Sequence, residues 1–172
     1  MEVQARIARA HARLAVITEQ IAALETAQRT TATTAGPDSA LGRLVRLKGV
    51  APTSASVLLD EGLLWRAFRN RREIGGLLGF APTRSASGET TRDQGIRRAG
   101  NRRLQTISVQ LAWNWIRWQP SSALTQWYLT HWRGGRRARL SGIVAVARKL
   151  LIALWRYASS GVVPTGAVLK AA

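Results

Sequence analysis

Apolar residues recur every three or four positions along most of this chain, and no segment alternates apolar with polar residues. Spacings of three and four place apolar side chains on one face of an α-helix, whereas a half-buried strand needs a period of two. The 172 residues are enough for one domain with a small appendage. We therefore expect an all-α protein.

The first 29 residues carry the most regular apolar pattern. The steps alternate between four and three, as in the a/d seam of a coiled coil, and the seam positions are Val3, Ile7, Ala10, Leu14, Ile17, Ile21 and Leu24. We expect residues 1–29 to form a long coiled-coil helix. Packing of this helix on its own domain is the alternative, which is slightly disfavoured because a narrow seam leaves most of the helix in water.

A change of composition separates this helix from the rest of the chain. Residues 30–40 are rich in Thr and contain a Gly-Pro pair, which opposes helix continuation and predicts a linker. Helical spacing returns over residues 41–161 and stops at Gly161. We expect residues 41–161 to form a compact helical domain and residues 162–172 to be a flexible tail.

The charge of the chain points to a polyanionic partner. Lys and Arg number 26 against 9 Asp and Glu, which gives a net charge of +17 and an isoelectric point near 12.0. Such an excess repels itself in a compact state, and a polyanion would relieve that repulsion. Nearly all the basic residues are Arg, whose planar guanidinium matches phosphate oxygens and the guanine edge. Nucleic acid is therefore the expected partner.

Several other classes of protein fit poorly. The chain has no Cys, and its two histidines, His11 and His131, lie far apart, so no metal site is expected. The N-terminus lacks a secretory signal, and the longest apolar stretch contains Arg148 and Lys149, so we expect no membrane span and a cytoplasmic, nucleoid-associated location. A membrane-surface protein is disfavoured, since an Arg-rich loop has no purpose there.

Residues 41–61 read as two helices joined by a tight turn that begins at Lys48. Gly49 permits a positive φ, and the turn exposes amides at the start of a helix, where phosphates bind well. The arrangement resembles a helix-hairpin-helix motif, although Ala51 stands where that motif usually has a second glycine. An ordinary corner between two helices is an equally good interpretation.

Residues 80–100 are the most informative segment. They read FAPTRSASGETTRDQGIRRAG, with many Ser, Thr and Gly, four basic side chains and little periodicity. A loop of about twenty residues inside a compact domain is uncommon unless it is functional. We expect a long Arg/Ser/Gly loop with a functional role.

The chain also contains seven Trp, six of them after residue 110. Base stacking is one interpretation. A Trp-rich core where the late helices meet is the favoured one, although Trp65 and Trp113 lie off the clearest apolar stripes.

Four blocks of sequence resemble a known family. They are LVRLKGVAPTSASVLLDE, FRNRREIGGLLGFAPTRSASGETTRDQGIRRAGNRR, AWNWIRWQPSSALTQWY and SGIVAVARKLLIALWRYASSGVVPTGA. Their order and spacing resemble the C-terminal transposase domain of the insertion-sequence family one-hundred-ten, most closely its eleven-eleven subgroup. The resemblance covers residues 41–168, and the N-terminal helix is similar to the coiled coil that precedes this domain in the family.

The resemblance implies an RNA-guided DNA recombinase in which a serine of a Ser-Gly pair attacks the DNA backbone and forms a phosphoserine intermediate. On that pattern the catalytic residue is Ser87, followed by Gly88, with Ser85 as a nearby competitor. A serine hydroxyl needs activation, and phosphoryl transfer needs cations against the developing charge. Guanidinium groups close in sequence can supply that charge: Arg84, Arg92, Arg97 and Arg98.

Further DNA- or RNA-binding residues are expected in the Arg clusters and at the glycine turn. These are Arg102, Arg103, Arg136, Arg137, Lys48 and Gly49. The expected partners are element-end and target DNA, a structured guide RNA, and a second copy or a full-length transposase held through the N-terminal helix.

Family members also carry an N-terminal ribonuclease-H-like domain with four acidic residues (DEDD) that hold Mg²⁺. No such constellation occurs among the nine acidic residues here. We therefore expect a truncated half-enzyme without a metal or cofactor of its own, needing Mg²⁺ only with an acidic partner domain. A non-catalytic DNA- or RNA-binding remnant or regulator is the alternative.

Overall fold

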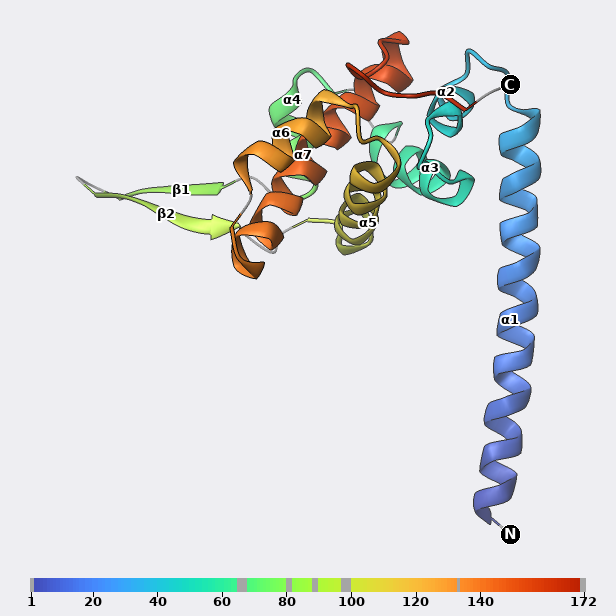
Figure 1. Cartoon of the computed structure of the whole chain (residues 1–172). Coiled ribbons are helices and arrows are strands. Elements are labelled where there is room, and N and C mark those ends of the chain that lie inside the picture. The colour runs from blue at the N-terminus through green and yellow to red at the C-terminus, as the bar shows by residue number, and fades with distance from the viewer. Residues whose placement is uncertain are drawn as a thin grey trace.

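The computed structural model describes residues 2–64, 68–79, 82–87, 90–96, 100–132 and 134–170, and for Arg72 and the two strands it describes the backbone alone. The elements are α1 Glu2–Thr34, α2 Ala40–Arg46, α3 Pro52–Leu58, the π-helical segment η1 Leu59–Leu63, α4 Arg71–Leu77, β1 Pro82–Ser87, β2 Thr90–Ile96, α5 Arg102–Trp118, α6 Ala123–His131 and α7 Arg136–Ser160. The expected helical architecture is confirmed: helices build the whole body of the molecule, and the strands form one hairpin outside it (Figure 1).

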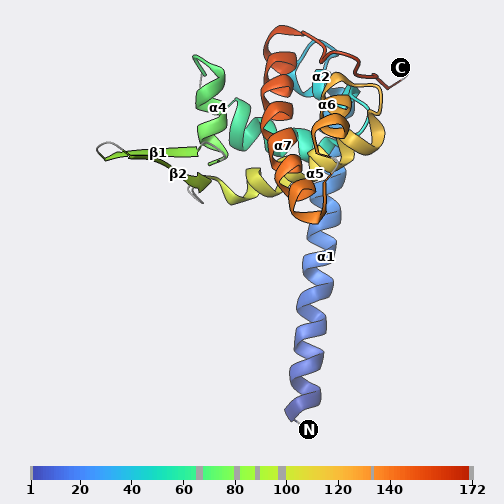
Figure 2. The same cartoon turned by 60° about the vertical axis from the view of Figure 1, so that its left-hand side comes forward.

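Helix α1 stands away from the body in both views (Figures 1 and 2). Among its described residues only Ala32, close to its C-terminal end, is buried. Its apolar seam faces solvent: Val3 is 67% exposed and Leu24 is 65% exposed. The alternative of a helix packed along its own domain therefore does not hold.

The expected linker at residues 30–40 is mostly wrong, because α1 continues through Thr34. Threonine hydroxyls commonly compete with helical hydrogen bonds, but here they join the helix by donating to the carbonyl one turn earlier. Thr30 and Thr34, for example, donate to the carbonyls of Thr26 and Thr30, at 3.1 and 3.0 Å. Only the residues around Gly36 and Pro37 leave the helical path before α2.

The core of the body forms where α2, α3 and α5 meet α7. Its largest fully buried side chains include Trp115 of α5 and Leu150 and Leu154 of α7. The indole Nε1 of Trp115 donates to the hydroxyl of Ser122 at 2.8 Å, so the buried ring leaves no donor unpaired. None of the described helices is both long and apolar enough to cross a bilayer.

Residues 165–170 are hydrogen-bonded to the body, so the expectation of a flexible tail at 162–172 is wrong for this part of it. The fully buried side chain of Gln119 accepts a hydrogen bond from Val168 N at 2.7 Å and donates to the carbonyls of Lys48 and Val168, both at 2.8 Å. Lys170 donates through Nζ to the carbonyls of Val45 and Val50. Burial lowers the pKa of the Lys170 ammonium below its usual value.

Residues 82–96 correct the expectation of a long irregular loop and of no sheet. Strands β1 and β2 pair in antiparallel fashion from Pro82↔Ile96 to Ser87↔Thr90, with an irregularity near Pro82. The hairpin projects from the body in both views (Figures 1 and 2), so its residues do not have to present an apolar face to a core. That placement explains why the alternating apolar pattern of an ordinary strand is missing.

Candidate nucleic-acid interface

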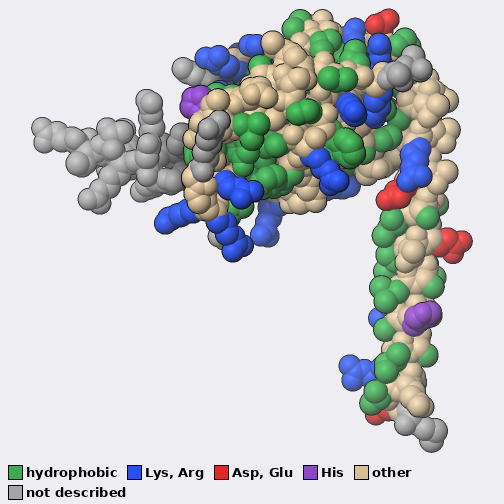
Figure 3. Space-filling model, in the orientation of Figure 1, with side chains coloured by type: hydrophobic (Ala, Val, Ile, Leu, Met, Phe, Trp, Pro, Cys, Tyr) green, Lys and Arg blue, Asp and Glu red, His purple; other side chains and the backbone are tan. Residues whose placement is uncertain are grey.

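Two long helices of the body begin with pairs of arginines. Arg102 and Arg103 open α5, Arg136 and Arg137 open α7, and neither helix has an acidic residue in its first turn. A helix N-terminus carries a positive partial charge, so cations there repel it. At α7, whose N-cap residue Gly135 provides no side-chain cap, unpaired amides together with arginines form a setting that an anion stabilises. Lys and Arg side chains gather on the underside of the body in Figure 3.

The start of α5 is held in place by its neighbours. The side chain of Asn101 caps the helix by accepting from the amides of Arg103 and Leu104, at 2.9 and 3.2 Å. Its amide nitrogen donates to Glu61 of η1 at 3.0 Å, and the same carboxylate forms a 2.8 Å ion pair with Arg103. Both arginines are exposed, but Arg103 is paired with a carboxylate of the protein itself, whereas Arg102 has no ion pair within the described part of the chain.

The turn between α2 and α3 has the expected conformation at Gly49, whose φ is +89°. A Cβ built there would lie 3.2 Å from Cβ of Trp118 and 3.4 Å from the carbonyl oxygen of Asn114. Backbone geometry and close approach therefore both require glycine at this position. Lys48 is exposed, and its amide and carbonyl are bonded to Val168 and Gln119 respectively. The turn is rigidly attached to the end of α5.

The hairpin places the two candidate serines near its outer end. Ser87 and Thr90 form the last pair of the ladder, on the side away from the body (Figure 1). Ser85 pairs with Arg92, and Arg84 pairs with Asp93 on the adjacent strand. The backbone thus brings two of the predicted arginines into the same short hairpin as both serines. Three further predicted residues lie outside the described residues, namely Gly88, Arg97 and Arg98.

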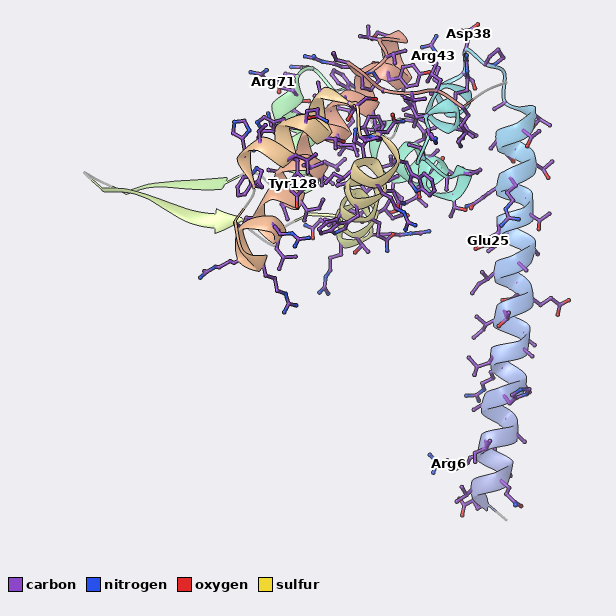
Figure 4. All side chains as sticks on the ribbon, in the orientation of Figure 1. Arg6, Glu25, Asp38, Arg43, Arg71 and Tyr128 are labelled. Carbon is purple, nitrogen blue, oxygen red and sulfur yellow. The ribbon has the colours of Figure 1, made fainter. Side chains whose placement is uncertain are left out.

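Among the basic side chains that the structure describes, most form no ion pair with an acidic residue of the same ranges. The described residues contain three ion pairs, Arg29–Glu25, Arg43–Asp38 and Arg103–Glu61. Figure 4 shows Arg43 close to Asp38 at the start of the body, and Arg6 far from both near the free end of α1. The remaining positive charge is available to a polyanion. No three His, Asp or Glu side chains converge within the described ranges, so these residues do not fit a Mg²⁺ site.

Sequence reasoning missed a basic hollow between α4 and the end of α7. Arg69, Arg71 and Arg156 line it together with Trp155, and its volume is about 670 Å³. The cluster at 69–72 was visible in the sequence, but its meeting with Arg156 depends on tertiary packing. Arg71 is labelled on the upper side of the body in Figure 4.

The tryptophans divide between the two interpretations. Trp115 is 1% exposed and belongs to the core, as favoured. Trp113 and Trp118, on the same helix, are 40% and 46% exposed, and the guanidinium of Arg117 lies 5.3 Å from the ring centroid of Trp118. The core interpretation is therefore wrong for Trp118, whereas the exposure of Trp113 agrees with its place off the apolar stripes.

A comparison with known proteins shows the family to which this chain belongs. Residues 42–127, half of the chain, match the family described as Transposase IS116/IS110/IS902. The chain belongs to this transposase family. The matched range holds the Gly49 turn, the hairpin and the whole of α5, while Arg136 and Arg137 of α7 lie beyond it.

Two curated proteins of Sinorhizobium fredii (strain NBRC 101917 / NGR234) are similar to this transposase chain. "Putative transposase y4rJ" is 48% identical over 129 residues, which cover 74% of this chain and 32% of that protein. "Putative transposase y4qE" is 30% identical over 139 residues, covering 65% of this chain and 34% of that protein. The chain thus spans about a third of the length of these relatives. No solved structure matches it.

Proposed function

We propose that this chain is the serine-bearing part of an insertion-sequence recombinase of the eleven-eleven subgroup, acting in DNA transposition. The observation that carries the proposal is the position of Ser87 at the outer end of an Arg-bearing hairpin, inside the range that matches the transposase family. A protruding hairpin can enter a groove or junction of DNA that the flat side of a helical body cannot reach.

Binding would come mainly from phosphate contacts. Arg102, Arg136 and Arg137 provide exposed guanidiniums at helix starts, and Lys48 adds a cation at the Gly49 turn, in the manner of a helix-hairpin-helix. Element-end DNA, target DNA and a structured guide RNA present the same phosphate chemistry, which would also keep the protein on the nucleoid. On duplex DNA each contact steepens the slope of log affinity against log salt by about 0.9.

The proposed reaction is an exchange of phosphodiester oxygens. The hydroxyl oxygen of Ser87 forms a bond to phosphorus as the sugar oxygen of the cut strand leaves, and the serine proton ends on that sugar oxygen. One P–O bond forms and one breaks, so the step needs no energy source. Arginines of the hairpin would neutralise the phosphate oxygens in the transition state. An acidic Mg²⁺-binding domain, in the same polypeptide or in a partner, would complete the site.

The test is a covalent adduct. The chain is mixed with a full-length relative whose own serine is replaced by alanine, together with element-end DNA and guide RNA, and denaturing gels are used to detect protein–DNA adduct. Ser87→Ala should abolish the adduct and leave binding nearly unchanged, since a hydroxyl adds little to a charge-dominated interface. Ser85→Ala is the matched control. Adduct that persists in Ser87→Ala but vanishes in Ser85→Ala would move the nucleophile to Ser85.

A binding-only remnant is the second candidate function. It is favoured by the lack of converging carboxylates among the described residues. Tight binding without adduct in every mixture, including the one with the full-length relative, would establish this candidate and reject the catalytic one.

We also propose that α1 pairs through its exposed seam with a second copy or with a full-length transposase. A seam of large apolar side chains that is half to two-thirds exposed loses stability in water and gains it by pairing. Ile17→Asp places a charge in this seam and should reduce the mass measured by light scattering. The matched control Glu19→Ala lies off the seam and should not. An unchanged mass and unchanged partner binding in Ile17→Asp would contradict the proposal.

A further inference from the structure

One side of α5 combines two exposed indoles with polar groups. Trp113, Asn114, Arg117 and Trp118 are all exposed, and their spacing of one, four and five positions places them on one broad face of the helix. Trp115 points into the core instead. We call these four residues the indole patch.

Contacts within the protein hold Arg117 and Trp118 of the indole patch. The Arg117 guanidinium lies 5.3 Å from the Trp118 ring centroid, a cation–π arrangement that holds the two side chains together. On its other flank, the Gly49 turn approaches so closely that a Cβ there would lie 3.2 Å from Cβ of Trp118. The exposed residue Lys48 adjoins the patch through this turn. Arg117 therefore stands beside the Trp118 indole, and the turn that carries Lys48 lies next to the same residue.

This combination is poorly suited to burial against an apolar helix. Arg117 and Asn114 would lose their water without a partner, which is costly for a guanidinium. An exposed aromatic ring beside a cation suits a ligand that has a planar, polarisable group with a negative charge attached close to it. Nucleic-acid bases with their phosphates have this chemistry, and they stack on aromatic side chains and on guanidinium planes.

The bases of a duplex are stacked on one another and offer only their edges, so an indole cannot reach their faces. We infer that the indole patch is a stacking platform for unpaired bases of single-stranded nucleic acid, with Arg117 and Lys48 set to meet the adjoining phosphates. The inference rests on the proposed nucleic-acid function and adds a ligand class to it. Because the patch offers few hydrogen-bonding groups, it would bind single strands with little base preference.

Measuring the nucleic-acid affinity of variants distinguishes failure of the stacking platform from failure of the proposed nucleic-acid function. The full chain, Trp113→Leu and Trp118→Leu are titrated into fluorescein-labelled oligo-dT and into a blunt duplex of mixed sequence. Each leucine should weaken oligo-dT binding about tenfold while duplex affinity stays within about twofold, because one stacked base contributes about 1–3 kcal/mol. Trp118→Phe keeps an aromatic face and should retain most of the affinity. Thermal unfolding checks that each variant folds.

Several outcomes would overturn the inference. Unchanged oligo-dT affinity in both leucine variants would reject the platform, and equal losses for oligo-dT and duplex would reject its selectivity for single strands. A wild-type chain that binds neither nucleic acid would instead reject the proposed function. A Glu–Tyr copolymer serves as the third probe. If the leucine variants lose affinity for the copolymer but keep their affinity for oligo-dT and duplex, the patch binds an acidic peptide and the inference is wrong.

A crosslinking measurement needs no variant. Ultraviolet light couples 5-iodouracil to aromatic residues that it stacks on, and peptide mass spectrometry locates the adduct. An oligonucleotide carrying 5-iodo-deoxyuridine should crosslink to Trp113 or Trp118. Crosslinks that map only to other residues would overturn the inference even if the leucine variants were unfolded.

Discussion

Arg103 and Glu61 form a 2.8 Å ion pair that ties the first turn of α5 to the π-helical segment η1. The same carboxylate accepts from the side-chain amide of Asn101, the residue that caps α5. Because α5 is the first helix after β2, Glu61 anchors the part of the body that follows the hairpin in the chain.

Asn101→Ala should destabilise the protein by about 1–2 kcal/mol, because two amides lose their cap and Glu61 loses a donor. Arg103→Met should cost less, at most about 1 kcal/mol, since the Arg103 side chain is 65% exposed and exposed ion pairs contribute little. Urea unfolding of both variants measures the order of the two effects. A larger loss in Arg103→Met would show that the ion pair, and not the cap, holds α5.

Reversing the charge at the start of α7 should have opposite effects on stability and binding. Arg136→Glu and Arg137→Glu replace cations with anions at a helix N-terminus, which should stabilise the fold by about 0.3–1 kcal/mol each. The same variants should bind duplex DNA more weakly and with a shallower salt dependence. Thermal unfolding and fluorescence anisotropy measure the two quantities. A variant that gains both stability and DNA affinity would contradict a binding role for these arginines.

One substitution at two glycines should change stability in opposite directions. A Cβ at Gly142 of α7 would lie 2.5 Å from Cγ of Trp132 and 2.9 Å from Cε2 of Tyr128, so Gly142→Ala should force α6 away and cost about 1–3 kcal/mol. Gly76 of α4 has no atom within 4 Å of such a Cβ. Gly76→Ala should therefore stabilise the helix by about 0.5–1 kcal/mol. Calorimetric unfolding of the pair tests both signs.

Gln119→Leu should release the C-terminal residues. It removes two donated hydrogen bonds and one accepted bond from a buried position, which should cost about 1–3 kcal/mol and leave the Lys48 carbonyl unpaired. Hydrogen exchange at the Val168 amide should become faster. Gln126→Leu is the matched control, because exposed Gln126 makes one bond, to the carbonyl of Pro120. Unchanged protection at Val168 would show that other contacts hold this segment.

Helical periodicity located the body of the protein well, because its helices bury apolar faces against one another, in a main cluster around Trp115 and in a second one that includes Tyr128. The positive φ of Gly49 and the exposed seam of α1 also followed from local patterns. The hairpin did not, since Ser85, Ser87 and their partners need no apolar alternation outside a core. A signal was present in the sequence, because Gly88 stands among the Ser and Thr residues of this segment and glycine is favoured in hairpin turns.

Other features depend on distant contacts that no local pattern encodes. The helix stop at Gly161 predicts a loose segment from Val162 onward, yet Gln119 and Arg46 bind Val168 and Lys170. The close approach of Trp118 to Gly49 joins two residues that lie far apart in the sequence. For the site, sequence could propose Ser87 and its arginines but not that Arg103 is engaged by Glu61.

The length of α1 sets a distance scale. Its 33 residues rise about 1.5 Å each, which gives a straight rod of about 50 Å. Along duplex DNA, where base pairs repeat every 3.4 Å or so, that distance corresponds to about fifteen base pairs, or one and a half turns. A partner bound at the free end of α1 would therefore lie about 50 Å from the body. Two sites one and a half turns apart on the same duplex are separated by the same distance.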